Sequence, residues 1–235
     1  MLILAIETSS AVSSVAVVSE EKLLAEITVQ TKLKHSETLL PHIESLLKMA
    51  DCPKENLDAI AVSIGPGSFT GLRIGLATAK ALSYALKKPL LTVSTLASLA
   101  VHFPVPEVTI MPLIDAQKGN AYAACWQYKD GEFQETAETK VLSLAEIEEL
   151  YQGAEGTVIL TGDYAQKKLK KDIALPANVL LAPQHLLMPR AANIGWLGIK
   201  KLQKNEVSSV MDAEPVYIRR SEAEVLWDKR HKGEQ

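Results

Sequence analysis

The chain has 235 residues with 25 Lys and Arg against 28 Asp and Glu, which gives a formal net charge of −3. That length suits one unit with two lobes, and the lack of a basic excess argues against independent binding of nucleic acid. The start has no basic leader and no apolar run approaches the roughly 20 residues of a membrane helix, so we expect a cytoplasmic protein that does not enter a membrane.

The N-terminal part of the chain predicts three strands and then a helix. Apolar or alternating runs separated by short polar turns are typical of an antiparallel meander, here over residues 2–6, 12–19 and 23–30. Ser36 can cap a helix whose apolar face runs to Ala50. Pro41 is compatible with that helix only near the first turn, where its missing N–H costs little.

A glycine-rich turn then joins a strand to a long helix. Residues 58–64 are typical of a strand buried on both faces, and Ser68 or Thr70 can cap a helix that runs to Leu86. The dinucleotide fingerprint needs a small residue where Thr70 stands, and the phosphate loop needs a lysine after Gly71, which is followed by leucine. Neither motif is present.

This helix carries small residues at a regular spacing. Gly67, Gly71, Gly75 and Ala79 recur every four residues and therefore share one face, although a glycine inside a helix costs roughly 1 kcal/mol relative to alanine. Such a stripe lets another backbone approach closely, and a helix that is apolar almost all round must be buried on more than one side. Two interpretations are open: a central helix packed on its own sheet, or a helix with one side against a partner protein.

The second half of the chain opens as the first does. An apolar strand over 108–115 ends on Asp115 and leads through a polar turn to a strand over 121–128, just as the first strand leads through Glu7 to the second. Residues 103–106 are expected to connect the two halves. The remaining predicted elements are strands over 89–93, 134–141, 157–161 and 178–181, helices over 95–102, 143–151 and 189–204, and a solvated basic segment over 167–171.

Several motifs in this order resemble the bacterial TsaB (YeaZ) family over nearly the whole chain. They are Ile3-Leu4-Ala5-Ile6-Glu7-Thr8-Ser9, His35-Ser36-Glu37, the run from Gly65 to Gly75, Ile114-Asp115-Ala116 and Pro215-Val216-Tyr217-Ile218-Arg219. The resemblance implies an α/β, two-lobed fold of the actin, hexokinase and heat-shock ATPase class (ribonuclease H-like) with duplicated mixed-sheet cores. The run of strand, acidic residue and hairpin that occurs once in each half of the chain independently favours the same duplicated fold.

The family's organisation sets the expected domains. We expect an N-terminal lobe over residues 1–103 with the partner-binding helices, and a second, smaller lobe over 104–220. The helix near 189–204 is a candidate to pack back on the first lobe, and residues 221–235 form a polar tail.

The resemblance also implies a function without catalysis. Members act as a scaffold or activator that dimerises with the sibling TsaD and enables binding of the ATPase TsaE. That complex adds a threonylcarbamoyl group to the adenosine next to the anticodon in tRNAs that read codons starting with A. The resemblance thus implies that the chain has no cofactor of its own and that ATP or ADP binds at the junction with its partners. It also implies that tRNA is contacted only through the complex and that the chain forms a homodimer when alone.

The expected contact surface comprises the helices that start at Ser36 and Thr70. Its candidate residues are Ser36, Leu39, Leu40, Ile43, Leu47, Phe69, Gly71, Leu72, Arg73, Gly75, Leu76 and Ala79. On this hypothesis, Gly71→Leu or Leu76→Glu leaves the monomer folded and abolishes the complex.

The alternative is a small-molecule kinase or ATPase acting alone. Glu7 and Asp115 are the paired carboxylates that such an enzyme would use around magnesium and phosphate. A residual nucleotide or phosphate contact would involve Glu7, Thr8, Ser9, Ser10, Gly65, Gly67, Ser68 and Asp115. The turn after Glu7 lacks the usual glycine, however, and no lysine or arginine is evident nearby, so this alternative is disfavoured.

Metal and nucleophile sites are not predicted. His35 and His42 are seven residues apart, about 10 Å of helix rise, which is too far for one ion. Cys52 and Cys125 have no metal or redox spacing and are expected to be reduced thiols. No nucleophile and base pair is visible, so no catalytic residues are expected.

Overall fold

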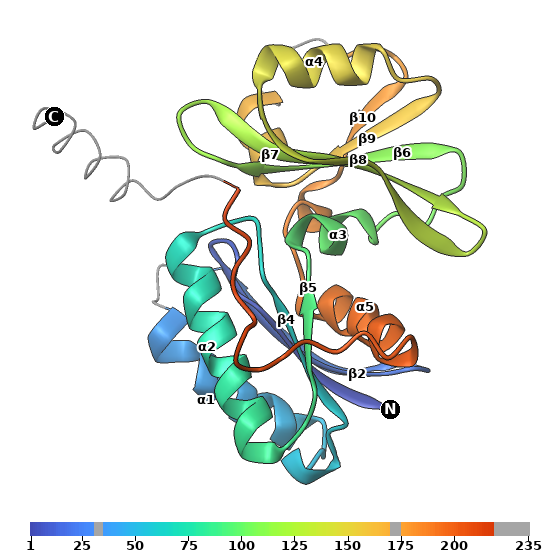
Figure 1. Cartoon of the computed structure of the whole chain (residues 1–235). Coiled ribbons are helices and arrows are strands. Elements are labelled where there is room, and N and C mark those ends of the chain that lie inside the picture. Colours follow the sequence, from blue (N-terminus) through green and yellow to red (C-terminus); the bar gives the residue numbers. More distant parts are fainter. Residues whose placement is uncertain (31–34, 170–174, 219–235) are drawn as a thin grey trace, which may run out of the picture.

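The structure is a computed structural model that describes residues 1–30, 35–169 and 175–218 of the chain. It has two lobes, each built on one five-stranded sheet, and Figure 1 shows them stacked one above the other. The terminal residues 221–235, predicted to be a polar tail, lie outside the described residues.

The first lobe contains the predicted meander and the glycine-turn helix. Its sheet has the order β3-β2-β1-β4-β5, with β1 antiparallel to β2 and parallel to β4. The elements are β1 (Leu2–Glu7), β2 (Val12–Ser19), β3 (Leu23–Gln30), α1 (His35–Met49), β4 (Ala59–Ser63), α2 (Phe69–Leu86) and β5 (Leu90–Val93), with a short 3-10 turn at Lys54–Asn56.

The second lobe repeats this topology. Its sheet has the order β10-β9-β6-β7-β8, which is the same arrangement with each strand replaced by its counterpart. The elements are β6 (Val108–Asp115), β7 (Asn120–Lys129), β8 (Glu132–Ser143), α4 (Leu144–Gln152), β9 (Thr157–Thr161), a π-helical turn (Ala165–Leu169), β10 (Val179–Leu181) and a 3-10 turn (Gln184–Leu186). The duplicated mixed-sheet fold predicted from the resemblance is therefore confirmed.

Helices cover both faces of the first sheet. Helices α1 and α2 bury one face, and α5 (Ala191–Gln203) returns from the second lobe to bury the other against β1 and β2 (Figure 1). Helix α3 (Thr95–Ala100) lies between the lobes and contacts β6, β7 and α5. Burial on both faces explains why β1 and β4 are almost continuous apolar runs and why β2 is apolar from Val15 to Val18.

The predicted elements differ from the observed ones chiefly at their ends. The helix predicted over 95–102 ends at Ala100, and the strand predicted over 134–141 extends to Glu132 and Ser143. Pro41 lies inside α1, in its second turn, one turn beyond the position where its missing N–H costs little.

After α5 the chain turns back along the first lobe. Ser208 donates from its backbone N–H to Leu90 O at the edge of β5, at 2.8 Å, and its hydroxyl lies 2.8 Å from that of Thr92. Residues 208–218, which we call the strap, then run beside α2 toward the second lobe, as the red end of the trace in Figure 1 shows. The course of this segment along the first lobe was not predicted from the sequence.

Candidate functional site

The glycine stripe of α2 packs against the turn between β1 and β2 of the same chain. A Cβ atom on Gly67 would lie closer than 3.0 Å to the carbonyl oxygen of Ser9, and one on Gly71 would meet that of Thr8 in the same way. A Cβ on Gly75 would collide with Thr8 Oγ1. The stripe therefore permits an approach within the monomer, and its assignment to a partner contact is wrong.

Hydrogen bonds fix the turn to the start of α2. Thr8 Oγ1 donates to Gly71 O at 2.8 Å, and Ser68 N–H donates to Ser9 O at 2.7 Å. Ser68 caps α2, since its hydroxyl accepts from Gly71 N–H at 3.3 Å, which confirms one of the two predicted caps. The turn and the helix thus form one connected unit.

The same turn uses its remaining polar groups within the chain. Ser9 N–H donates to Glu7 Oε1 at 2.6 Å, and Val12 N–H donates to Ser10 Oγ at 3.1 Å. The Ser10 carbonyl oxygen lies 2.9 Å from His35 Nε2. A phosphate bound here would compete for the N–H groups of Ser9 and Val12, which already have acceptors.

Glu7 is entirely buried at the end of β1. Burial raises the pKa of its carboxyl group, while the neighbouring Ser9 and Ser63 lower it by less. Glu7 Oε2 has no hydrogen-bond partner among the described groups. An enclosed carboxyl group whose neutral form is favoured is poorly suited to hold magnesium in a cleft.

Asp115, at the equivalent end of β6, belongs to an ion-pair cluster in the second lobe. Lys167 Nζ lies 3.1 Å from Asp115 Oδ2 and 2.8 Å from Asp163 Oδ2. Burial lowers the pKa of Lys167, but its hydrogen bonds and ion pairs with the two carboxylates outweigh this and raise it. Gln117 N–H donates to Asp115 Oδ1 at 2.8 Å, and Asp115 N–H donates to Asp163 Oδ1 at 3.0 Å.

A solvated basic segment was predicted over 167–171; Lys167 and Lys168 are exposed, Leu169 is buried, and residues 170–171 lie outside the described part. The ion pairs of Lys167 with the two carboxylates were not predicted. Its ammonium group neutralises the carboxylate that the kinase alternative would use for magnesium. Asp163 and Lys167 are four residues apart, and in a helical segment that spacing favours an ion pair between opposite charges. The sequence therefore held a signal for this ion pair. Together, Glu7 and Asp115 do not fit a magnesium and phosphate site.

The predicted interface residues divide into buried and exposed ones. Those buried in the monomer, which leaves them little surface of their own to offer a partner, are Leu39, Ile43, Gly71, Leu72, Gly75, Leu76 and Ala79. Leu47 is half-buried, and the exposed ones are Ser36, Leu40, Phe69 and Arg73. The side chains of Leu39, Ile43, Leu76 and Ala79 pack in one core cluster with β1, β2 and β4, because the apolar face of each helix points to the sheet.

Large apolar side chains that remain exposed gather on α1, α2 and the strap. Of 14 such side chains among the described residues, seven lie on these three segments, which make up less than a fifth of the chain. They are Leu40, Met49, Phe69, Tyr84, Met211, Val216 and Tyr217. Sequence analysis missed the strap and Tyr84, although both carry exposed aromatic rings.

Other kinds of site find no support in the described residues. No three His, Cys, Asp or Glu side chains there are grouped so that they could hold a metal ion. None of the helices described is long and apolar enough to cross a membrane. Cys52 and Cys125 are buried free thiols, and burial raises the pKa of Cys125 to about 11.

Comparisons with known proteins agree over most of the chain. The family model described as TsaD, tRNA N6-adenosine threonylcarbamoyltransferase, matches residues 22–227. The tRNA threonylcarbamoyladenosine biosynthesis protein TsaB of Bacillus subtilis (strain 168) is 32% identical over 235 residues, covering 99% of this chain and 100% of the relative. The protein of the same name from Escherichia coli (strain K12) is 29% identical over 234 residues, covering 97% of this chain and 98% of the relative.

A solved structure supports the same relationship. YeaZ from Pseudomonas aeruginosa superposes with a TM-score of 0.78 at 27% identity, covering 92% of this chain and 99% of that one. The sequence relatives, the family model and the shared fold point to one group of proteins. The chain belongs to the TsaB (YeaZ) family.

Proposed function

We propose that the chain is a non-catalytic subunit in the biosynthesis of threonylcarbamoyladenosine in tRNA. In this proposal it pairs with a TsaD homologue, and an ATPase of the TsaE type joins the pair. ATP or ADP binds at the junction of the subunits, and tRNA is held through the complex. The names of the full-length relatives support the pathway.

The observation that carries the proposal is the exposed apolar surface of α1 and α2. Leu40 is 59% exposed and Tyr84 is 70% exposed, although both side chains are large enough to favour burial. Apolar side chains that gather on one face of a soluble protein are typical of a contact with another protein. When the partner is missing, the same face is expected to join two copies in a symmetric dimer.

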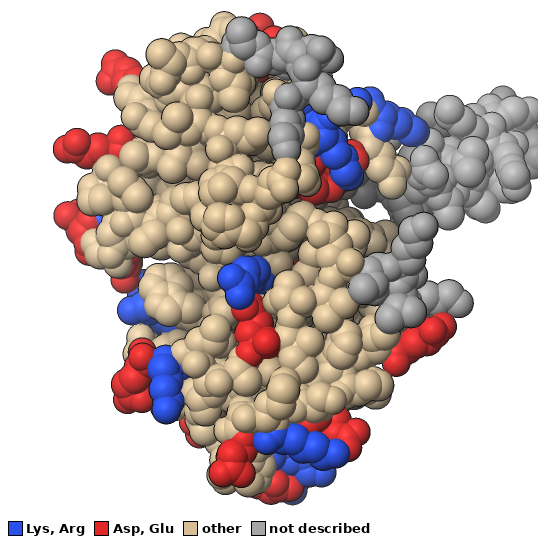
Figure 2. All heavy atoms as spheres, turned by 180° about the vertical axis from the view of Figure 1, so that it is seen from behind, with Lys and Arg blue, Asp and Glu red and all other residues tan. Residues whose placement is uncertain are grey.

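The polar groups at the ends of β1 and β6 are consistent with a non-catalytic role. The groups that a kinase of this fold class would use have partners inside the chain: Ser9 bonds to Glu7, and Lys167 pairs with Asp115. Figure 2 shows, on the rear face outside the grey atoms, basic side chains that are scattered or next to acidic ones. That face therefore presents no cluster of positive charge of the kind that favours direct binding of phosphates.

Reconstitution of the transfer reaction tests the proposal. The TsaD and TsaE homologues of the same organism are assayed for transfer to tRNA with and without this chain. We expect transfer to depend on it, and an equal rate without it would contradict the proposal. ATP hydrolysis by the isolated chain that is lost in Glu7→Gln would favour the kinase alternative instead.

A matched pair of substitutions tests the surface. Leu40→Glu places a charge on α1 and should weaken binding to the TsaD homologue at least tenfold in calorimetry. Leu180→Glu is the control, because Leu180 is similarly exposed, at 52%, but lies on β10 in the second lobe. Equal effects of the two variants would exclude α1 from the contact.

A further inference from the structure

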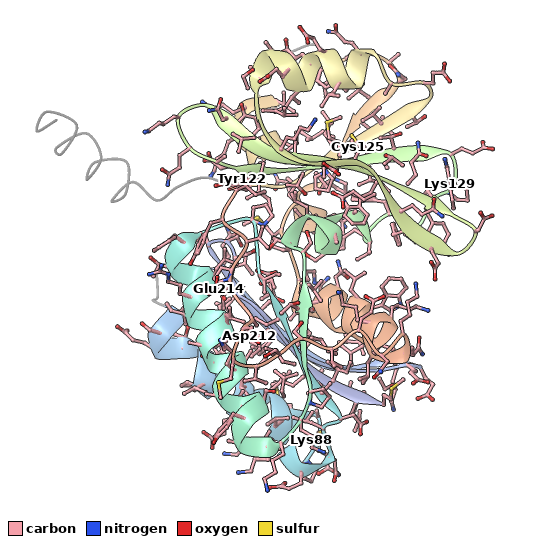
Figure 3. The ribbon with its side chains drawn as sticks, viewed as in Figure 1. Lys88, Tyr122, Cys125, Lys129, Asp212 and Glu214 are labelled. Atoms are coloured by element: carbon pink, nitrogen blue, oxygen red, sulfur yellow. The ribbon has the colours of Figure 1, made fainter. Side chains whose placement is uncertain are left out.

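The strap and α2 enclose a groove that sequence analysis did not foresee. Its volume is about 520 Å³, and Figure 3 shows Asp212 and Glu214 of the strap lying alongside α2. The lining combines apolar groups with three charged side chains. The lining residues are Arg73, Leu76, Ala77, Lys80, Ala213, Glu214, Pro215 and Tyr217.

Backbone contacts hold the strap in place beside the helix. Lys80 Nζ donates to the carbonyl oxygens of Met211 and Ala213, at 2.9 and 3.1 Å. Further along, Val216 N–H donates to Ile64 O at 2.8 Å. The groove is therefore formed before any partner arrives, which reduces the entropy lost on binding.

Three side chains form an ordered and exposed cluster at one end. The Arg73 guanidinium lies 3.8 Å from the centre of the Phe69 ring, and the Phe69 and Tyr217 ring centres are 5.1 Å apart. Arg73 Nε also donates to the Tyr217 hydroxyl at 2.9 Å. Tyrosine and arginine dominate the energy of protein interfaces, and here the contacts of Arg73 fix both side chains in advance.

The charges of the groove favour an acidic partner group. Arg73 forms no ion pair with a carboxylate of the described residues, and its Nη atoms have no hydrogen-bond partner there. Lys80 is bonded to carbonyl oxygens, which do not neutralise it. Glu214 is the acidic residue in the lining, so two cations face one carboxylate.

We propose that this groove receives an apolar side chain of the TsaD-like partner, next to a carboxylate that pairs with Arg73. The inference rests on the proposed function and extends the contact from α1 and α2 to the strap. The apolar side chain packs between Ala77 and Pro215, and the carboxylate meets the free edge of the guanidinium. Tyr217 holds that guanidinium in position.

Calorimetry with the TsaD homologue of the same organism tests the groove. Ala77→Trp fills it from an exposed position and should raise Kd at least tenfold. Arg73→Gln should raise Kd and also make it less dependent on salt, because it removes one charge pair. Glu214→Gln should lower Kd, since it removes the acid that repels the incoming carboxylate.

The control is Ala145→Trp, which adds the same side chain at an exposed position on α4 in the second lobe and should leave Kd unchanged. An unchanged Kd in Ala77→Trp, with an unchanged thermal midpoint, would overturn the groove and leave the proposed function intact. A wild-type chain that does not bind the homologue would overturn both. Loss of self-association alone, with TsaD binding retained, would overturn the assignment of the partner.

Discussion

At the scale of single residues, the glycines of α2 determine how closely two segments can approach. Thr8 lies over Gly71 and Gly75, where its carbonyl and hydroxyl oxygens occupy the space that a methyl group would need. Thr8 Oγ1 also donates to Gly71 O, so a shift of the turn would strain this hydrogen bond. Packing therefore outweighs the cost in helix propensity of roughly 1 kcal/mol per glycine.

Gly71→Ala tests this balance. Helix propensity alone would stabilise the protein by about 1 kcal/mol, but the collision with Thr8 should give a net loss of about 1–3 kcal/mol. The free energy of unfolding is measured by urea denaturation. This prediction replaces the expectation that Gly71→Leu leaves the monomer folded.

The control is Ala77→Gly at an exposed position of the same helix, which should cost about 1 kcal/mol through propensity alone. A stabilised Gly71→Ala variant would show that the turn moves aside without cost.

His102 makes stability depend on pH. Burial, and then the charge of Arg190, lower its pKa to about 4 from an ordinary value of 6.5, and neither ring nitrogen has a described hydrogen-bond partner. The folded state therefore binds a proton more weakly than the unfolded state. The stability from this group is complete above pH 6.5 and is lost as the pH falls toward 4.

His102→Gln should remove this dependence. Between pH 7 and pH 4, wild type should lose about 3 kcal/mol more of its unfolding free energy than the variant, because 2.5 pKa units at 1.36 kcal/mol per unit set the limit. Urea denaturation at several pH values gives the difference. Parallel curves for the two proteins would show that folding does not lower the pKa of His102.

At the scale of elements, the sequence predicted what depends on local pattern. The helix predicted over 143–151 is α4, where Ser143 and Glu146 form a capping box. The apolar period of α2 predicted its extent to within one residue. The strap has no period of its own, and its position depends on Lys80 and Ile64, which are distant in the sequence. For the same reason the glycine stripe was recognised but its partner was not.

The start of α5 shows how two distant strands hold a helix. Glu26 of β3 accepts from Ala192 N–H at 3.0 Å and pairs with Arg190, while Ser14 Oγ of β2 accepts from Ala191 N–H at 3.0 Å. A carboxylate at a helix N-terminus is favourable because the first N–H groups lack partners within the helix. These bonds attach α5, which comes from the end of the chain, to the first sheet.

Glu26→Ala should therefore destabilise the protein by about 2 kcal/mol, since it leaves Arg190 and a helix N–H without their partner. Chemical denaturation measures this loss. Lys204→Ala removes the ion pair with Glu132, whose two side chains are both more than half exposed, and should cost less than about 1 kcal/mol. A similar loss in both variants would contradict a special role for the cap.

At the scale of the whole molecule, both lobes have the same topology, but the acidic residues at the equivalent strand ends, Glu7 and Asp115, have different surroundings. Glu7 is buried beneath the turn of β1 and β2, and Asp115 pairs with Lys167 in the second lobe. The sequence predicted the repeat, because each half has the same run of strand, acid and hairpin. It could not predict the separate partners of the acids, since both depend on side chains brought in by the fold.

Binding of nucleotide to the isolated chain tests this difference. A ligand present at about 100 times its Kd stabilises the folded state by about 2.7 kcal/mol, which raises the thermal midpoint of a protein this size by about 5–10 °C. Because the turn and Asp115 already have partners within the chain, we expect millimolar magnesium and ATP to leave the midpoint unchanged. Differential scanning calorimetry is the measurement.

The complex with the TsaD homologue is the matched comparison, and there the proposed junction site should raise the midpoint when the nucleotide is added. A rise of several degrees in the isolated chain that Asp115→Asn abolishes would mean that the second-lobe cluster opens to bind magnesium. Magnesium binding would then require Lys167 to leave the carboxylates of Asp115 and Asp163. Because Lys167→Met removes both ion pairs, it is the variant in which such binding should be easiest to detect. An isolated chain that stays unresponsive even in Lys167→Met would assign nucleotide binding to the assembled subunits.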